Sequence, residues 1–227
     1  MTSTSPPGVD TVILDLDGTL VDSVYVHTLA WRAAFRDVGV EVASHRIHRA
    51  IGMGGDRLVA HVTDDRVESA VGDTVRERHA HHLDDHFHDI VPVPGATELL
   101  EALRSRVPHV VLASSGDAET TGRLLDLVEG ADVVLQHVVS GADAESKPAG
   151  DLIEAALRSV GSASAVVIGD AVWDAEAAAR AGVPSIGLLS GGFSRAELTG
   201  AGCTEVYDTP VELARRIETS LIGRCSR

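Results

Sequence analysis

The sequence has few cysteines and no long apolar run, and each absence excludes a class of protein. Its two cysteines, Cys203 and Cys225, indicate neither a disulfide framework nor a zinc site, so a reducing compartment is the simplest setting. No apolar stretch approaches the roughly 20 residues of a membrane-spanning helix. Residues 1–8 lack the charged and apolar regions of a signal peptide. We therefore expect a cytoplasmic protein with a flexible tail at 1–8.

Aromatic residues and positive charge are also scarce. Aromatics make up 3% of the 227 residues, so Ala, Val, Leu and Ile must build the core. The formal charge of −15 argues against partners such as nucleic acid or an anionic membrane. It does not exclude a small anionic substrate, because a metal ion and one lysine can reverse the local field. Nothing in the sequence requires more than a monomer.

The chain alternates between strand-like and helical segments, apart from one long stretch with no strong strand. We expect strands at 12–14, 109–113, 133–139, 165–168, 184–188 and 205–207. Helices are expected at 22–38, 44–51, from Arg57, and at 66–88, 96–106, 120–128, 151–160, 175–181 and 211–222. Strand–helix alternation predicts an α/β fold with a parallel sheet. We expect this core over 9–21 and 92–227, with an all-α insertion over 22–91.

The segment that suggests chemistry is Val12 to Leu20, where an apolar run leads into Asp15 and Asp17 and then a glycine turn. If the run is a buried strand, alternation places both carboxylates on the same side of its end. Burying like charges this close is costly unless a cation or a shared proton compensates. The segment therefore predicts a site, although a polar turn after a strand would have the same residue types.

Two later strands also end in polar residues. Ser114, Ser115 and Gly116 follow an apolar strand, where hydroxyls and free backbone N–H groups can hold phosphate oxygens. An ordinary turn and helix cap is the alternative. Lys147, the only lysine in the chain, precedes a proline and so lies on extended backbone. Its ammonium could offset the carboxylates and bind a phosphoryl oxygen, although most lysines lie on the surface.

A further strand ends at Asp170, and Asp174 follows four residues later. Carboxylates from two strand ends, together with a backbone carbonyl and waters, can supply the six oxygen ligands of Mg²⁺. Acids at a helix N-terminus also occur because they favour the helix dipole, which leaves that alternative open.

Taken together, these motifs resemble those of the haloacid dehalogenase-like hydrolase superfamily. The segments that carry the resemblance are DLDGTL, LASSG, SKP and IGDAVWD. It covers essentially the whole chain from about Val9 and implies a Rossmann-like three-layer α/β/α core. The insertion at 22–91 resembles the α-helical cap of the branch that contains phosphoglycolate phosphatases and β-phosphoglucomutases.

The resemblance implies a Mg²⁺-dependent phosphatase that hydrolyses a small phosphorylated metabolite, of the phosphoglycolate or sugar or polyol phosphate type. Asp15 would be the nucleophile and form an aspartyl-phosphate, while Asp17 would act as general acid and base. Ser114 and Lys147 would hold the phosphoryl group, helped by Ser115 and Gly116. Dehalogenases and phosphonatases of the family lack an aspartate at position 17, so its presence favours phosphate esters.

The resemblance also implies a metal site, with Mg²⁺ held by Asp15, Asp170, Asp174 and the backbone carbonyl of Asp17. Within the expected cap, the glycine-rich loop 52–55 is flanked by Arg49 and Arg57, which are candidates for substrate binding. Related mutases carry a cationic residue in this loop, where this chain has glycine, which favours a hydrolase over a phosphosugar mutase.

Two other interpretations remain open at this point. A catalytically idle interaction protein would have lost a motif acid or the lysine, and all are present. Five histidines between His79 and His88 form a second unusual segment. Because His82 and His86 lie four residues apart, one helical face could bind a transition metal, although a solvated face is the simpler interpretation.

Overall fold

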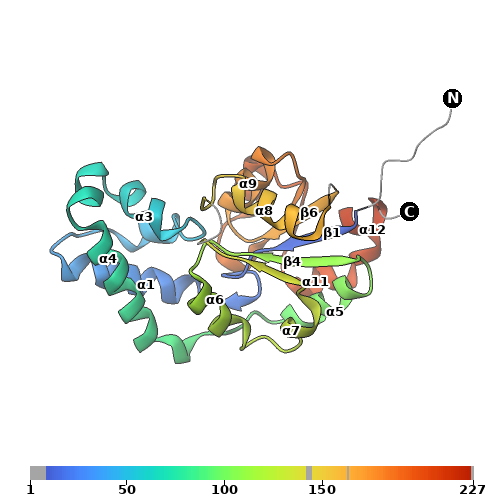
Figure 1. Cartoon of the computed structure of the whole chain (residues 1–227), viewed down its shortest axis with the longest axis horizontal. Coiled ribbons are helices and arrows are strands. Elements are labelled where there is room, and N and C mark those ends of the chain that lie inside the picture. The colour runs from blue at the N-terminus through green and yellow to red at the C-terminus, as the bar shows by residue number, and fades with distance from the viewer. Residues whose placement is uncertain (1–8, 142–144, 163, 226–227) are drawn as a thin grey trace.

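The computed structural model describes residues 9–141, 145–162 and 164–225. The expected tail at 1–8 lies outside these residues. A six-stranded parallel sheet forms the centre of the molecule in the order β5-β4-β1-β6-β7-β8 (Figure 1). Its strands are β1 (Thr11–Leu14), β4 (His109–Ala113), β5 (His137–Val139), β6 (Ala165–Gly169), β7 (Ser185–Leu188) and β8 (Glu205–Tyr207). The predicted α/β class and Rossmann-like parallel core are confirmed.

Side-chain alternation along β1 gives the sheet two buried faces. Ile13 points to the face covered by α8 (Asp151–Val160) and α9 (Val172–Arg180). Val12 and Leu14 point to the opposite face, which packs against leucines of α5 (Ala96–Arg104), α6 (Ala118–Leu125) and α11 (Pro210–Arg215). Figure 1 shows these helices above and below the strands. β1 therefore lies in the middle of three layers and ends at the centre of the sheet edge.

A group of helices is inserted between β1 and α5. It contains α1 (Val24–Asp37), α2 (Ser44–His48), α3 (Gly55–Val62), α4 (Asp65–Asp85) and the short 3₁₀ helix η1 (Phe87–Asp89). A two-stranded antiparallel ribbon closes its base, with β2 (Val21–Asp22) paired to β3 (Val91–Pro92). The group has its own apolar core, which includes Trp31, Phe35 and Ile47. It projects from one end of the sheet, as Figure 1 shows at left.

Two element predictions were wrong in their bounds. The apolar run expected as a strand at 133–139 begins as a short helix, α7 (Ala131–Val134), because Gly130 adopts a positive φ of 81° and starts a helical turn. Apolar runs of this length do not distinguish a strand from a buried helix. The helix expected at 211–222 is divided into α11, the 3₁₀ helix η3 (Ile217–Thr219) and α12 (Leu221–Cys225), since Ser220 is extended.

The sequence analysis also missed several short elements. The ribbon β2–β3 has two residues in each strand, too few for a periodic pattern. The 3₁₀ helix η2 (Leu189–Gly191) and helix α10 (Arg195–Ala201) follow β7 and pack beside α9. No helix in the described part of the chain combines the length and apolar character that a membrane span needs.

Candidate active site

The residues singled out at strand ends converge at the carboxyl edge of the sheet. Asp15 follows β1, and its backbone N–H donates to the carbonyl of Ile168 in β6 at 2.9 Å. Asp170 follows β6 directly, and Asp174 lies in the first turn of α9. These three carboxylates are at most 5% exposed, and one oxygen atom from each lies within 4.8 Å of the others. Parallel strands that end together thus place three buried acids around one point.

Lys147 supplies the counter-charge to this cluster. It follows β5, and its side chain is 1% exposed. The ammonium contacts Asp15 Oδ1 and lies 2.7 Å from Asp174 Oδ1. The peptide bond from Lys147 to Pro148 is cis. The only lysine of the chain is therefore buried between two of the acids, and the alternative of a surface lysine is excluded.

Asp170 lies in a niche formed by small residues. The hydroxyl of Thr19 donates to Asp170 Oδ1 at 3.1 Å. A Cβ on Gly18 would lie 2.4 Å from Asp170 Oδ2, and one on Gly191 would lie 1.6 Å from the same atom. Neither position can carry a side chain without moving the carboxylate. The glycine of the DLDGTL segment thus makes room for an acid more than 150 residues later in the chain.

Burial, together with the proximity of the acids to one another, shifts their pKa values. Burial, followed by the charges of Asp174 and Asp17, raises the pKa of Asp15 to about 7 despite the opposing effect of Lys147. Burial and the same kind of repulsion, from Asp15 and Asp174, raise the pKa of Asp170 well above its usual range. Burial by itself would lower the pKa of Lys147, but the charges and hydrogen bonds of Asp15 and Asp174 outweigh it, so the pKa is raised.

This donor set fits a divalent cation. Three buried carboxylate oxygens lie close enough together to share one ion, and oxygen ligands are those that Mg²⁺ prefers. One ammonium does not balance the acids, and a cation among them would favour their charged forms and oppose the raised pKa values. Among the described residues, Asp15, Asp170 and Asp174 are the one group of three acids, histidines or cysteines close enough to hold a metal.

The carboxylate of Asp17 turns away from this cluster. Its Oδ1 accepts a hydrogen bond from the hydroxyl of Ser23 and lies 3.1 Å from Nε2 of His27 in α1. Burial by itself would raise the pKa of Asp17, but His27, Ser23 and Lys147 together lower it. Asp17 is therefore ionised at neutral pH and its side chain is engaged with the helical group rather than with the other acids.

A second histidine extends this arrangement. His27 Nδ1 lies 3.1 Å from Nε2 of His79 in α4, and the ring of His79 stacks on Trp31 with centroids 4.0 Å apart. Burial and the neighbouring His27 lower the pKa of His79 well below its usual range, so its ring is neutral. The contact between His27 and His79 could not be predicted from the sequence, because it depends on the packing of α1 against α4.

The serine segment after β4 is divided between two roles. Ser114 is 1% exposed, and its hydroxyl accepts a hydrogen bond from the N–H of Gly116 at 3.1 Å. The hydroxyl of Ser115 points to the helical group and donates to the carbonyl of Gly52 at 3.3 Å. Ser115 and Gly116 line the cavity beside Asp15, whereas Ser114 is not among its lining residues.

This cavity lies between the sheet edge and the helical group and has a volume of about 80 Å³. The sheet side is formed by Asp15, Asp17, Ser115 and Gly116. The helical side is formed by His27, Trp31, Ile51, Gly52, Met53, Gly55 and His79. A group that reacts with Asp15 in this cavity would therefore contact both parts of the chain.

The two arginines expected to bind substrate lie elsewhere. Arg49 pairs with Glu197 in α10, and its guanidinium lies 4.5 Å from the centre of the Phe193 ring. Arg57 Nη2 lies 2.9 Å from Glu145 Oε1. Neither lines the cavity. Both instead join the helical group to the core, as does the indole N–H of Trp173, which donates to the carbonyl of Arg49 at 3.0 Å.

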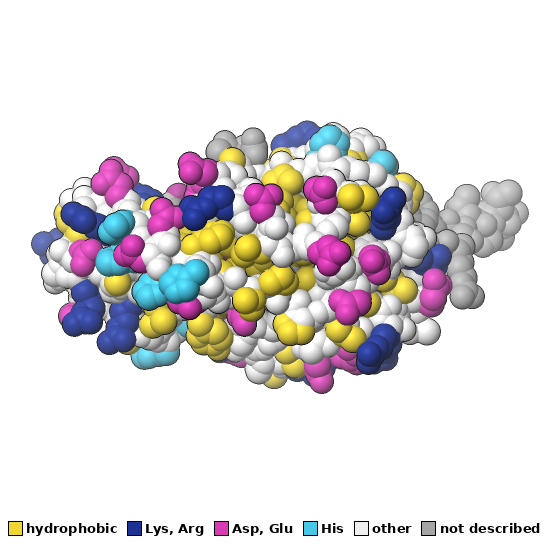
Figure 2. Space-filling view, turned by 90° about the horizontal axis from the view of Figure 1, so that it is seen from below, with side chains coloured by type: hydrophobic (Ala, Val, Ile, Leu, Met, Phe, Trp, Pro, Cys, Tyr) yellow, Lys and Arg dark blue, Asp and Glu magenta, His cyan; other side chains and the backbone are white. Residues whose placement is uncertain are grey.

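The other histidines of α4 and η1 also have separate partners. His82 lies 2.8 Å from Asp37, and His86 lies 3.2 Å from Asp89. Figure 2 shows histidine side chains at the helical end of the molecule, where His81, His86 and His88 are exposed. His82 and His86 therefore contact different acids, as on a solvated face.

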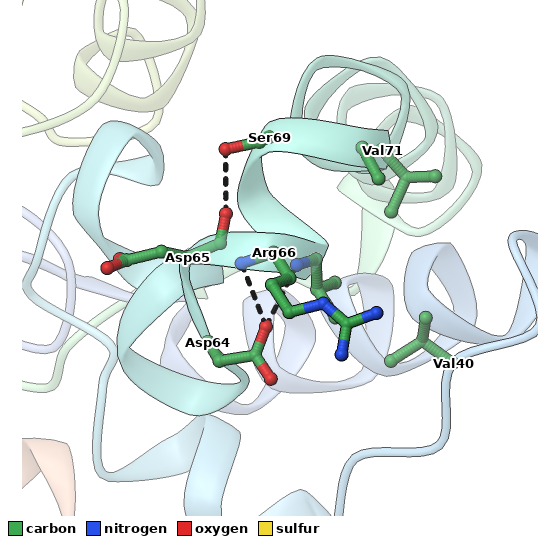
Figure 3. A pocket seen from close by; sticks show the side chains of 8 residues that line it. Val40, Asp64, Asp65, Arg66, Ser69 and Val71 are labelled. Carbon is green, nitrogen blue, oxygen red and sulfur yellow. Dashed lines mark hydrogen bonds between the residues drawn. The ribbon is translucent and has the colours of Figure 1, made fainter.

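A larger surface hollow lies away from Asp15, Asp170 and Asp174. It has a volume of about 920 Å³ and lies at the start of α4 (Figure 3). Asp64, which lines it, accepts hydrogen bonds from the backbone N–H groups of Arg66 and Val67 and so caps the helix. Its other lining residues include Asp65 and Arg66, but among the described residues no three acids, histidines or cysteines there lie close enough to share a metal ion.

Comparison with known proteins places this arrangement in context. Residues 9–182 match a family described as haloacid dehalogenase-like hydrolases. The chain is similar to a phosphoglycolate phosphatase from Caulobacter vibrioides, at 28% identity over 93% of this chain and 92% of that protein. It is also similar to a phosphonoacetaldehyde hydrolase from Bordetella pertussis, at 26% identity over 84% of this chain and 76% of that protein. The crystal structure of a hydrolase from Pseudomonas syringae superposes with a TM-score of 0.86 at 35% identity, covering 92% of this chain and 98% of that one.

Proposed function

The chain belongs to the haloacid dehalogenase-like hydrolases and is a phosphoric monoester hydrolase, and from this premise we propose that it is a Mg²⁺-dependent phosphatase of small phosphorylated metabolites. The observation that carries the proposal is the position of Asp15. Its carboxylate lies at the end of the central strand, against Lys147, and faces a cavity closed on the other side by the helical group.

The reaction would begin with attack of the Asp15 carboxylate on the phosphorus of a bound ester. The bond from phosphorus to the ester oxygen breaks, Asp17 protonates the departing alkoxide, and an aspartyl-phosphate remains on Asp15. Asp17 then takes a proton from water, which attacks the phosphorus and releases phosphate and free Asp15. The proton that Asp17 removes from water in one turnover is available for the leaving group of the next.

The lowered pKa of Asp17 favours the carboxylate form, which is the form that accepts a proton from water. The negative charge of a bound phosphate ester would raise this pKa again and so favour the protonated form that the acid step needs. His27 contacts the carboxylate directly at 3.1 Å and can hold its orientation in both steps. The hydroxyl of Ser23 donates to the same oxygen, so that the group is positioned before substrate enters.

Charge neutralisation would come from two sources. Lys147 would balance the charge of Asp15 and of the transferring phosphoryl group, and the hydroxyl and N–H groups after β4 would bind its oxygens. Mg²⁺, held by Asp15, Asp170, Asp174 and the backbone carbonyl of Asp17, would supply a further counter-charge to the phosphoryl oxygens.

We further propose that residues 22–91 act as a cap domain on a catalytic core made of 9–21 and 92–227. Hydrogen bonds from Ser115 to Gly52 and from Trp173 to Arg49 support a direct contact between the two. A mutase would need a grip on a second phosphate. Among the described residues, no arginine or lysine lines the cavity, which favours the hydrolase.

The test is phosphate release from a panel of small phosphate esters with and without Mg²⁺. We expect release with Mg²⁺, loss of release after chelation, and a loss of at least about 10³-fold in Asp15→Asn. Asp126→Asn is the matched control, because Asp126 is exposed on the core away from the cavity, and it should retain activity. Undiminished release by Asp15→Asn, or in the presence of EDTA, would overturn the proposal.

A further inference from the structure

The cap side of the active cavity carries no arginine or lysine side chain among the described residues. Its polar side chains are those of His27, Trp31 and His79, and its loop contributes Ile51, Met53 and glycines. Because His79 is buried beside another histidine, its ring is neutral. In the described part of the chain, no arginine or lysine lines this cavity. Whatever group of the substrate faces the cap therefore meets imidazole, indole and backbone rather than a guanidinium or ammonium group.

The cap arginines closest to the glycine-rich loop are already paired with acids. Arg49 contacts Glu197, and Arg57 contacts Glu145. Neither could reach the cavity without breaking an ion pair that also joins the cap to the core.

Arg76 of α4 is engaged in the same way. Its guanidinium donates to Glu68 Oε1 and Asp73 Oδ1, both at 2.8 Å, and to the carbonyl of Gly55 at 3.0 Å. The hydrogen bond with Glu68 is the main reason that the pKa of Arg76 is raised. Arg76 therefore stabilises the glycine-rich loop through Gly55, and these donors are engaged by protein acceptors rather than free for substrate.

The cavity beside the leaving group is small and offers no arginine or lysine partner. Asp17 lines it next to His27, and its volume of about 80 Å³ leaves little room for water. A carboxylate or second phosphate on the leaving group would lose its hydration there without meeting a guanidinium or ammonium group, which is unfavourable. Hydroxyl groups, in contrast, can exchange hydrogen bonds with neutral imidazole and backbone carbonyls.

We propose that the substrate is a phosphate ester of an uncharged alcohol or polyol, and that the cap selects against esters whose leaving group carries a second negative charge. This inference rests on the proposed function. It separates the chain from relatives named as phosphoglycolate phosphatases, because phosphoglycolate bears a carboxylate on its leaving group.

Two matched pairs of esters test the charge directly. In each pair a carboxylate replaces a hydroxymethyl group and the carbon number stays the same: 2-phosphoglycolate against 2-hydroxyethyl phosphate, and 3-phosphoglycerate against glycerol 1-phosphate. With wild-type protein and saturating Mg²⁺ at pH 7.5, we expect kcat/KM at least tenfold higher for the neutral member of each pair. Equal or better turnover of the charged member in either pair would overturn the inference.

A change of charge in the loop tests the cause. Met53 lines the cavity on the cap side. Met53→Lys should shift the ratio of kcat/KM towards the charged member of each pair by at least tenfold, whereas Met53→Gln, of similar length and no charge, should not. An equal shift in both variants would show that the selection does not depend on charge. If Met53→Lys does not fold, the comparison of the two ester pairs with wild-type protein still tests the inference.

The outcomes separate this inference from the proposed function. If phosphate is released faster from the charged esters, the proposed selection is contradicted, but the proposal of a Mg²⁺-dependent phosphatase is not. No release from any of the four esters, nor from p-nitrophenyl phosphate, contradicts the phosphatase proposal and the selection with it.

Discussion

Replacing Lys147 with methionine should unfold the protein at a much lower temperature. The ammonium is 1% exposed and contacts both Asp15 and Asp174. Removing one partner of a buried ion pair leaves an uncompensated charge and costs about 3–5 kcal/mol. For a chain of this size, each kcal/mol corresponds to roughly 2–4 °C in Tm. The expected decrease is therefore about 6–20 °C in EDTA at pH 8.

The size of this effect should depend on pH, with a sign that follows from the raised pKa of Asp15, about 7. Below that pH the carboxyl group takes up a proton and no longer needs the ammonium. The difference in Tm between wild type and Lys147→Met should therefore be largest near pH 8 and smaller near pH 5.5. A surface ion pair would show little change over this range.

Thermal unfolding followed by circular dichroism, with phosphate release measured in parallel, provides the assay. Arg158→Met is the matched control, because Arg158 pairs with Glu154 at 3.5 Å with both side chains more than half exposed. It should cost less than about 1 kcal/mol. Activity of Lys147→Met should fall by about 10²–10³. A decrease in Tm below about 2 °C at pH 8, equal to that of the control, would refute the idea that Lys147 neutralises buried charge.

Three further predictions concern the metal, the arginines and the histidine beside Asp17. Because the pKa values of Asp15 and Asp170 are raised, protons compete with Mg²⁺ for these carboxylates. The rise in Tm on adding Mg²⁺ should therefore be larger at pH 8 than at pH 5.5. An equal rise at both pH values would contradict the assigned ligands. Arg49→Ala and Arg57→Ala should each lower kcat/KM by less than tenfold, since both guanidiniums are paired with acids outside the cavity; a loss of 100-fold or more would show direct substrate binding. His27→Ala should lower kcat by about 10–100-fold with KM nearly unchanged, because the residue positions an acid–base group, and an effect confined to KM would argue for a substrate contact instead.

The sheet and its polar edge were predictable because their signals are local. Three apolar strands, β1, β4 and β6, are each directly followed by a residue of the predicted site, namely Asp15, Ser114 and Asp170. Parallel strands must bring these ends to one edge, so the convergence of Asp15 and Asp170 follows from chain order without any knowledge of distances. The apolar faces expected over 22–38 and the helical composition of 66–88 likewise predicted the helical insertion.

The contacts within the cap and between cap and core were not predictable. His27 and His79 are 52 residues apart, and nothing in either local segment indicates that they meet. The positions of Arg49 and Arg57 beside the glycine-rich loop suggested substrate binding, yet each has an acid within reach from a distant core segment. Pairing of this kind depends on how helices pack against the sheet, which periodicity does not specify.

The single lysine has a practical consequence for chemical probing. Apart from the α-amino group, the chain offers one amine, and it lies buried with its proton retained by two carboxylates. A protonated, inaccessible amine does not acylate, so an amine-selective reagent should label Lys147 only in molecules whose cap or sheet edge has opened. Mass spectrometry of the wild-type protein would give the rate of this labelling, and the rate would report how often the catalytic edge is exposed to solvent.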